Sequence, residues 1–198
     1  TDMSVMIFGE NGTGKEHIAH HLHDKSKRAG KPFVAVDCGS LTKELAPSAF
    51  FGHVKGAFTG ADSTKKGYFY EAEGGTLFLD EVGNLALETQ QMLLRAIQER
   101  RYRPIGDKSD RSFNVRIIAA TNEDLEAAVS EKRFRQDLFY RLHDFGITVP
   151  PLRDCQEDIL PLAEFFREIA NKELECNVSG FSSEARKALL THAWPGNV

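Results

Sequence analysis

The segment from Gly9 to Glu16 combines glycines and a lysine in a pattern that is typical of phosphate binding. It matches the pattern GxxxxGK, and it lies between a short apolar run and an amphipathic stretch. Glycines at such a turn let consecutive backbone N–H groups face phosphate oxygens, and the helix N-terminus adds a favourable dipole. We expect a phosphate-binding loop in which Lys15 reaches the β- and γ-phosphates. Its residues are Gly9, Glu10, Asn11, Gly12, Thr13, Gly14, Lys15 and Glu16.

The alternative for this segment is a glycine-rich turn with a chance lysine. The usual pattern also has Ser or Thr after the lysine as a Mg²⁺ ligand, whereas this chain has Glu16. A carboxylate there should repel phosphates unless it points away, so the metal must depend on another acid. That acid follows an apolar run that ends in Asp80-Glu81. We expect Asp80 to hold Mg²⁺, directly or through water, and Glu81 to position and polarise an attacking water.

A third apolar run ends in Thr121-Asn122. Ligands bind at the carboxyl ends of parallel strands, so Asn122 could contact the γ-phosphate or the attacking water. Asn is equally suited to begin the helix that we expect from Glu123. The residues alone leave both roles open.

The loop Gly56, Ala57, Phe58, Thr59, Gly60, Ala61 is the most unusual stretch of the chain. Its two glycines allow sharp bends on either side of a single aromatic residue. One interpretation is a hairpin whose Phe58 packs back on the core, and the other is a mobile tip that binds a partner.

These segments need a framework of alternating strands and helices. We predict strands at 4–8, 33–36, 76–79, 115–119 and 145–149, and helices at 16–27, 87–100 and 123–131. Nearly apolar strands separated by helices indicate an α/β fold with a parallel sheet covered on both faces. After Pro150-Pro151 only helices are predicted, at 157–174 and 182–193. We therefore expect an α/β nucleotide-binding core at 1–151 and a helical subdomain at 152–198.

Composition excludes several classes of protein. The 198 residues carry a net charge of −4, so no basic excess favours nucleic-acid binding. No apolar run approaches the roughly 20 residues of a membrane span. Three widely spaced cysteines indicate a reducing compartment, and we expect a cytoplasmic protein. The chain begins almost on a strand and ends in a Trp-Pro-Gly-Asn turn, which we interpret as a piece of a longer protein.

Three motifs together resemble one known family. The segments 9–16, 51–61 and 74–81 strongly resemble the central AAA+ ATPase domain of bacterial sigma-54-dependent transcriptional activators, the enhancer-binding proteins that include nitrogen-regulator-like response regulators. The likeness continues through 120–122, 134–142 and 194–197. The Gly56–Ala61 segment is nearly diagnostic of this family, whereas the phosphate loop alone indicates only an NTPase.

The resemblance implies a P-loop NTPase core followed by a partial all-helical lid. Family members form hexamer or heptamer rings with ATP and Mg²⁺ at subunit interfaces, and the Gly56–Ala61 loop engages sigma-54 and remodels RNA polymerase. By position, Asp80 and Glu81 match the Walker B acids, and Thr121 and Asn122 match sensor I. Arg135 and Arg141 match the arginine fingers. Enhancer DNA would bind a separate C-terminal domain.

Three departures from the family pattern affect what can be carried over. Asp37 stands where members have a switch Asn, and an acid facing Glu81 should raise one pKa or push the pair apart. A sensor II arginine would follow Val198, and the family's segment before the first strand is missing.

Two other clusters have weaker functional interpretations. His17 and His21 have zinc-compatible i, i+4 spacing, although a solvated helix face is the alternative. Arg100, Arg101 and Arg103 are consistent with nucleic-acid binding, or with a loop or subunit contact.

Three functions remain open: an ATPase that remodels sigma-54 polymerase, a binding module switched by nucleotide without turnover, and a small-molecule phosphotransferase. The first accounts for all the motifs.

Overall fold

The computed structural model describes residues 2–198, which form two compact units. The sheet unit comprises residues 2–9 and Lys15–Thr148. The helical unit comprises Glu10–Gly14 and Val149–Val198. The central part of the predicted phosphate loop therefore groups with the helices, while Lys15 groups with the sheet.

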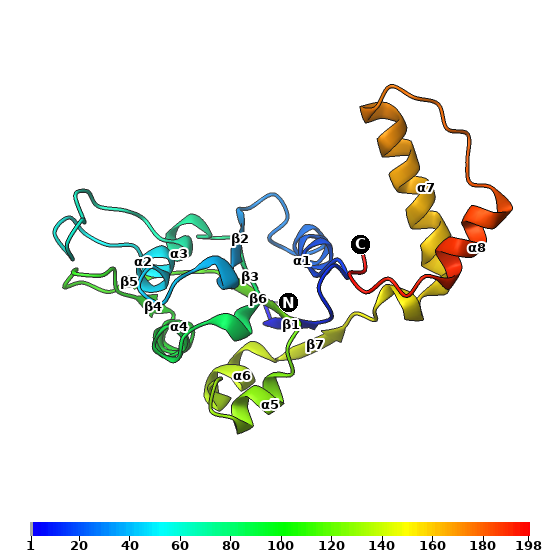
Figure 1. Cartoon of the computed structure of the whole chain (residues 1–198). Helices are drawn as coiled ribbons and strands as arrows, with labels where there is room; N and C mark the ends of the chain where they lie inside the picture. The colour runs from blue at the N-terminus through cyan, green and yellow to red at the C-terminus, as the bar shows by residue number, and fades with distance from the viewer. Residues whose placement is uncertain (1) are drawn as a thin grey trace. The chain divides into compact units, whose positions relative to one another are not determined.

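The sheet unit is built on five parallel strands, which confirms the predicted fold class (Figure 1). The strand order is β2-β3-β6-β1-β7. All neighbours pair in parallel, so the carboxyl ends of the strands lie at one edge of the sheet. The strands are β1 Val5–Phe8, β2 Phe33–Asp37, β3 Thr76–Asp80, β6 Arg116–Thr121 and β7 Phe145–Thr148.

Helices flank this sheet, and a small antiparallel hairpin lies beside them (Figure 1). Three helices correspond to the predicted ones: α1 Lys15–Asp24, α4 Leu87–Glu99 and α5 Leu125–Ser130. Three short ones were not predicted: α2 Ala46–Phe51, α3 Tyr68–Glu71 and α6 Gln136–Leu142. The hairpin strands β4 Arg101–Tyr102 and β5 Arg111–Ser112 were also not predicted, since two-residue strands leave no periodicity in the sequence.

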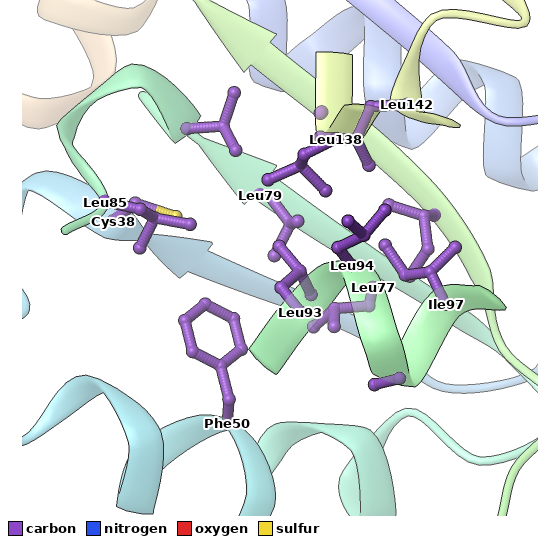
Figure 2. Packing of buried hydrophobic residues seen from close by; sticks show 14 of the residues in the cluster. Cys38, Phe50, Leu77, Leu79, Leu85, Leu93, Leu94, Ile97, Leu138 and Leu142 are labelled. Carbon is purple, nitrogen blue, oxygen red and sulfur yellow. The ribbon is translucent and has the colours of Figure 1, made fainter. Parts of the chain in front are cut away.

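The core of the sheet unit explains why its central strands are apolar throughout. On one face of β3, Leu77 and Leu79 are fully buried and pack towards Leu93 of α4 (Figure 2). On the other face, the ring of Phe78 stacks at 6.1 Å from that of Phe33. Both faces of the strand are covered, as a parallel sheet requires.

The helical unit contains a short 3-10 turn, η3 Leu152–Asp154, and two helices, α7 Gln156–Glu173 and α8 Ser183–Thr191. The Ser182 hydroxyl caps α8 by accepting a hydrogen bond from the Ala185 N–H at 3.2 Å. Within residues 2–198, no helix is long and apolar enough to cross a membrane.

Candidate functional site

Lys15 is a buried lysine at the first position of α1. Its side chain is only 6% exposed. Its ammonium group donates to the Gly9 carbonyl at 3.0 Å and lies 3.3 Å from Glu81 Oε1. Because a buried ammonium group is stable only with oxygen partners around it, these contacts fix its position at the end of β1.

Glu81 occupies a strained backbone position directly after β3. Its φ of 51° and ψ of 47° lie in the left-handed region, which residues other than glycine rarely adopt. The turn lets its carboxylate contact two elements: Oε1 approaches Lys15, and Oε2 accepts the Asn122 backbone N–H at 3.2 Å. The ends of β3 and β6 are therefore linked through one acid. Strain of this kind concentrates at functional sites.

The sequence pointed to Thr121 and Asn122 at the end of β6, and they differ in exposure. Thr121 is fully buried, and its hydroxyl accepts a hydrogen bond from the Glu123 N–H at 3.1 Å. The Asn122 side chain is exposed, and helix α5 is capped by Asp124 instead. Asn122 is therefore not the helix cap, although its contact with phosphate or water stays a prediction.

Asp80 is partly buried at the last position of β3, where it lies opposite Asp37. Burial is the main cause that raises its pKa, and the neighbouring Glu81 charge acts in the same direction. Lys15 opposes this shift, whereas Asp37 adds to it. Its surroundings thus disfavour the charged form of the Asp80 carboxyl, and a bound cation would act in the opposite direction.

Two other acids of the predicted site turn elsewhere. Asp37 is exposed, and its Oδ1 accepts the Gly39 N–H at 2.8 Å, capping the short turn η1 Cys38–Ser40. In the register of β2 and β3, Asp37 lies opposite Asp80, and its charge helps to raise the pKa of Asp80. Glu16 is also exposed and lies 3.9 Å from the imidazole of His20, so its carboxylate points away from the loop backbone.

The loop Glu10–Gly14 has the backbone shape that phosphate binding requires. Gly12 and Gly14 have φ values of 76° and 82°, which only glycine adopts without strain. The Thr13 hydroxyl donates to the Glu10 carbonyl at 2.8 Å, which closes the turn. The Glu10 carboxylate bonds to Arg153 and Asn197 of the helical unit. Neither Arg153 nor Asn197 was predicted as a site residue, because no local sequence pattern links positions so far apart.

The two candidate arginines lie at opposite ends of α6. Arg135 immediately precedes the helix, and its guanidinium group makes two hydrogen bonds, at 3.0 and 2.8 Å, with Asp137. Its backbone N–H donates to Gln90 of α4 at 2.8 Å, which anchors the start of α6. Arg141 lies in the last turn of the helix and is exposed.

The Gly56–Ala61 loop is closed at its base and open at its tip. The Gly56 N–H donates to the Ala61 carbonyl at 2.8 Å, and both Gly56 and Gly60 have positive φ values. Phe58 remains 45% exposed and makes one edge contact with the ring of His53, 4.9 Å away. The ring therefore projects from the loop and is not inserted in the core.

Of the four histidines of α1, His20 and His23 make packing contacts, whereas His17 and His21, which share the i, i+4 spacing, are exposed. The His20 ring stacks on Phe33 at 3.8 Å, and buried His23 shares a hydrogen bond with the Thr76 hydroxyl at 2.9 Å. No cluster of three or more metal-ligating side chains occurs among residues 2–198.

Comparison with known proteins places this geometry in one family. Residues 1–148 match the sigma-54 interaction domain, and residues 153–198 match the AAA+ ATPase lid domain. The chain is 49% identical, over its full length, to the transcriptional regulatory protein ZraR of Klebsiella oxytoca, of which it covers 45%. It is 47% identical to the Sigma54-dependent transcriptional activator SfnR of Pseudomonas putida and covers 54% of that protein. The chain thus spans about half the length of the curated relatives it matches.

Solved structures agree with this assignment. The crystal structure of NtrX from Brucella abortus in complex with ADP matches the whole chain with a TM-score of 0.92 and 36% identity. The chain covers 43% of that structure, and NtrX in complex with ATP gives the same TM-score. The chain therefore belongs to the sigma-54 interaction domain family and carries the AAA+ ATPase domain of a sigma-54-dependent transcriptional regulator.

Proposed function

We propose that this chain hydrolyses ATP and uses the energy to remodel sigma-54 RNA polymerase at promoters. The observation that carries the proposal is the linkage of Lys15, Glu81 and Asn122 at the carboxyl ends of β1, β3 and β6. In a parallel sheet, those ends form the ligand-binding edge. The complexes of NtrX with ADP and ATP support a nucleotide as the ligand.

The residues present fit ATP as the substrate. The backbone of Glu10–Gly14 would bind phosphate oxygens, and Lys15 would exchange part of its contact with Glu81 for the β- and γ-phosphates. That exchange frees a carboxylate next to the γ-phosphate. Glu81 would then orient the attacking water and accept its proton, while Asn122 would contact the water or the γ-phosphate.

Mg²⁺ fits the same site through Asp80. Burial raises the pKa of the Asp80 carboxylate, and a bound divalent cation would offset the free-energy cost of burying its charge. Mg²⁺ would supply charge neutralisation at the phosphates. Glu16 would contribute through its backbone N–H and not as a metal ligand, because its side chain is directed to His20.

Arg135 and Arg141 would complete the site of a neighbouring subunit. A planar guanidinium group suits the charge that spreads over a phosphoryl group during transfer. Arg135 forms an ion pair with Asp137 of its own chain. This pair would have to break before Arg135 could reach the site of a neighbouring subunit. A site completed by a neighbouring subunit favours a hexamer or heptamer ring, in which hydrolysis depends on assembly.

The Gly56–Ala61 loop would be the segment that moves during ATP hydrolysis and contacts the partner protein. Phe58 is exposed, and the closed base of the loop can transmit displacement to the tip. The family match to a sigma-54 interaction domain supports sigma-54 as the partner. Asp37 would act as the switch between nucleotide and loop, through its effect on Asp80. Enhancer DNA would be bound by a separate domain of the whole protein.

The ring mechanism predicts that ATPase activity per subunit rises with protein concentration. The ATPase activity of the Arg135→Ala variant should be lower by about 1,000-fold or more, the range for arginine fingers, while its ATP binding should be normal. Constant activity per subunit at all concentrations would contradict the shared site. Tight binding without turnover would instead favour a nucleotide-switched binding module, and would single out Asp37→Asn for study.

If Phe58 contacts sigma-54, the Phe58→Ala variant should lose sigma-54 binding but keep ATP hydrolysis. The variant should keep its ATPase rate within about twofold, because Phe58 is exposed and touches only His53 among the described rings. It should lose sigma-54 binding in the presence of a nucleotide analogue. Tyr70→Ala, which removes a similarly exposed ring outside the loop, is the matched control. Equal sigma-54 binding by the two variants would contradict the proposal.

A further inference from the structure

Within the helical unit, the Glu10–Gly14 segment forms an ion pair with Arg153. The Arg153 guanidinium group holds both oxygens of the Glu10 carboxylate, with Nη1 at 2.9 Å from Oε2. Asn197 donates to the same Oε2 at 3.3 Å. These bonds lower the pKa of Glu10 to about 2, so the pair is fully charged at neutral pH. Both charged side chains are nearly half exposed, and salt should weaken the pair.

Asn197 is the buried member of this contact. It is 6% exposed, and every polar atom of its amide has a partner. Its Oδ1 accepts the Leu152 N–H at 2.8 Å, while Nδ2 donates to the Asn11 carbonyl at 2.8 Å. Because one side of the amide must accept and the other must donate, only asparagine in this orientation satisfies both neighbours.

These bonds orient the peptide groups of the loop. The carbonyls of Asn11 and Gly12 accept from Asn197 Nδ2 and from the Val198 N–H, the latter at 3.1 Å. In a planar trans peptide the N–H points opposite to the carbonyl. The Gly12 N–H therefore points away from the Asn197 side chain. The hydrogen bonds to the loop carbonyls thus leave the Gly12 N–H oriented to donate to an anion on the side of the peptide opposite Asn197.

The backbone of the helical unit also explains why residue 12 is glycine. A Cβ atom at this position would lie 2.1 Å from the Gly196 carbonyl oxygen, a distance that no structure tolerates. Gly14 has a similar φ, yet a Cβ there meets nothing within 4 Å. The close packing on the helical unit is therefore specific to Gly12.

We propose that Arg153 and Asn197 are positioning residues, which hold the Asn11–Gly12 peptide in the orientation that receives a nucleotide phosphate. The proposal rests on the ATPase function argued above and deepens it. Asn197 contributes more than Arg153, because losing it leaves the Leu152 N–H and the Asn11 carbonyl without their partners, whereas the ion pair is exposed to water.

The first test is hydrogen exchange on the nucleotide-free chain. Asn197→Asp keeps the acceptor for Leu152 but loses the donor to Asn11, and Arg153→Gln loses the ion pair. Both variants should exchange faster in a peptide covering residues 9–15, with α7 and α8 unchanged. Arg186→Gln, which removes an exposed pair with Glu164 in the same unit, is the matched control and should leave the loop unaffected. Unchanged exchange at residues 9–15 in Asn197→Asp would overturn the proposal.

The second test is ADP affinity and steady-state kinetics. Asn197→Asp should weaken ADP binding about tenfold, the effect of a lost hydrogen bond to a charged partner, and Arg153→Gln about threefold. KM for ATP should rise by similar factors while kcat changes little. Arg153→Lys should recover part of the loss. In the double variant of Glu10→Gln with Arg153→Gln, the effects should not add, since both remove one bond.

The outcomes separate the two proposals. If the parent chain binds ADP and both variants bind it equally well, the positioning role is wrong and the ATPase function stands. If the parent does not bind ADP at all, the ATPase function fails, and the positioning role fails with it whatever the exchange data show. A fall in kcat with unchanged KM would also overturn the proposal, because it would place these residues in the chemical step.

Discussion

The sheet unit and the helical unit are stabilised in different ways. All six residues of β6 are buried, as are four of the five residues of β3. In contrast, α8 has no buried residue, and the only one in the 18-residue α7 is Ile159. Phe165 and Phe166 are exposed on α7. The sheet unit is stabilised mainly by burial of close-packed apolar side chains, whereas the helical unit depends more on polar contacts.

The phosphate loop is divided between these two kinds of structure. Lys15 begins a helix that packs on the sheet, whereas Glu10–Gly14 is bonded to the helical unit, where a cavity of about 280 Å³ borders Trp194 and Asn197. A loosely packed region opens at lower free energy than a dense core. The residues proposed for chemistry therefore lie on the densely packed unit, whereas those proposed to orient the loop lie on the more loosely packed one.

A matched pair of leucines tests the difference most strongly. Leu79→Ala in β3 should reduce the free energy of unfolding by about 2–5 kcal/mol, because it creates a cavity in a fully buried site. Leu190→Ala in α8, where the side chain is 36% exposed, should cost less than about 1 kcal/mol. Chemical denaturation followed by circular dichroism measures both. Equal losses would show that the helical unit has a core of its own.

Asp80→Asn should stabilise the nucleotide-free sheet unit while it abolishes Mg²⁺-dependent hydrolysis. Burial raises the pKa of Asp80, so its contribution to stability is fully present below the unfolded pKa and is lost as pH rises through the folded value. The variant should have a higher Tm than the parent at pH 7, because asparagine carries no charge in this partly buried position. The difference in Tm should shrink as the pH approaches 4. A lower Tm at pH 7 would mean that Asp80 is a structural acid.

The Glu10–Arg153 pair gives the smallest expected effect. The pKa of Glu10 falls from 4.5 to about 2 in the folded chain. The contribution of the ionised Glu10 carboxylate to folding stability is therefore present above pH 4.5 and is lost as the pH falls towards 2. Trp194 is the only tryptophan of the chain, and its carbonyl accepts the Asn197 N–H at 3.0 Å. Trp194 fluorescence should change between pH 4.5 and 2, and Glu10→Gln should abolish that dependence. The same titration in the variant would assign the change to another group.

Local patterns in the sequence were enough to predict the parallel sheet and the longer helices. The apolar runs that became β1, β3 and β6 are buried on both faces, so each had to be apolar throughout. The phosphate loop and the Gly56–Ala61 loop could also be predicted, since backbone positions at positive φ are usually occupied by glycine. The short helices α2, α3 and α6 were missed, because four to seven residues carry too little periodicity.

Patterns of neighbouring residues were sufficient to predict the family, the fold class and the acids at the strand ends. The contacts that these acids make depend on how the folded backbone places them. Register brought Asp37 opposite Asp80, and the left-handed turn at Glu81 directed its carboxylate to Lys15 and the Asn122 N–H. The contact of Asn197 with Asn11 joins residues 186 positions apart. Such contacts arise when the folded backbone brings distant groups within hydrogen-bond distance, and no local pattern encodes that proximity.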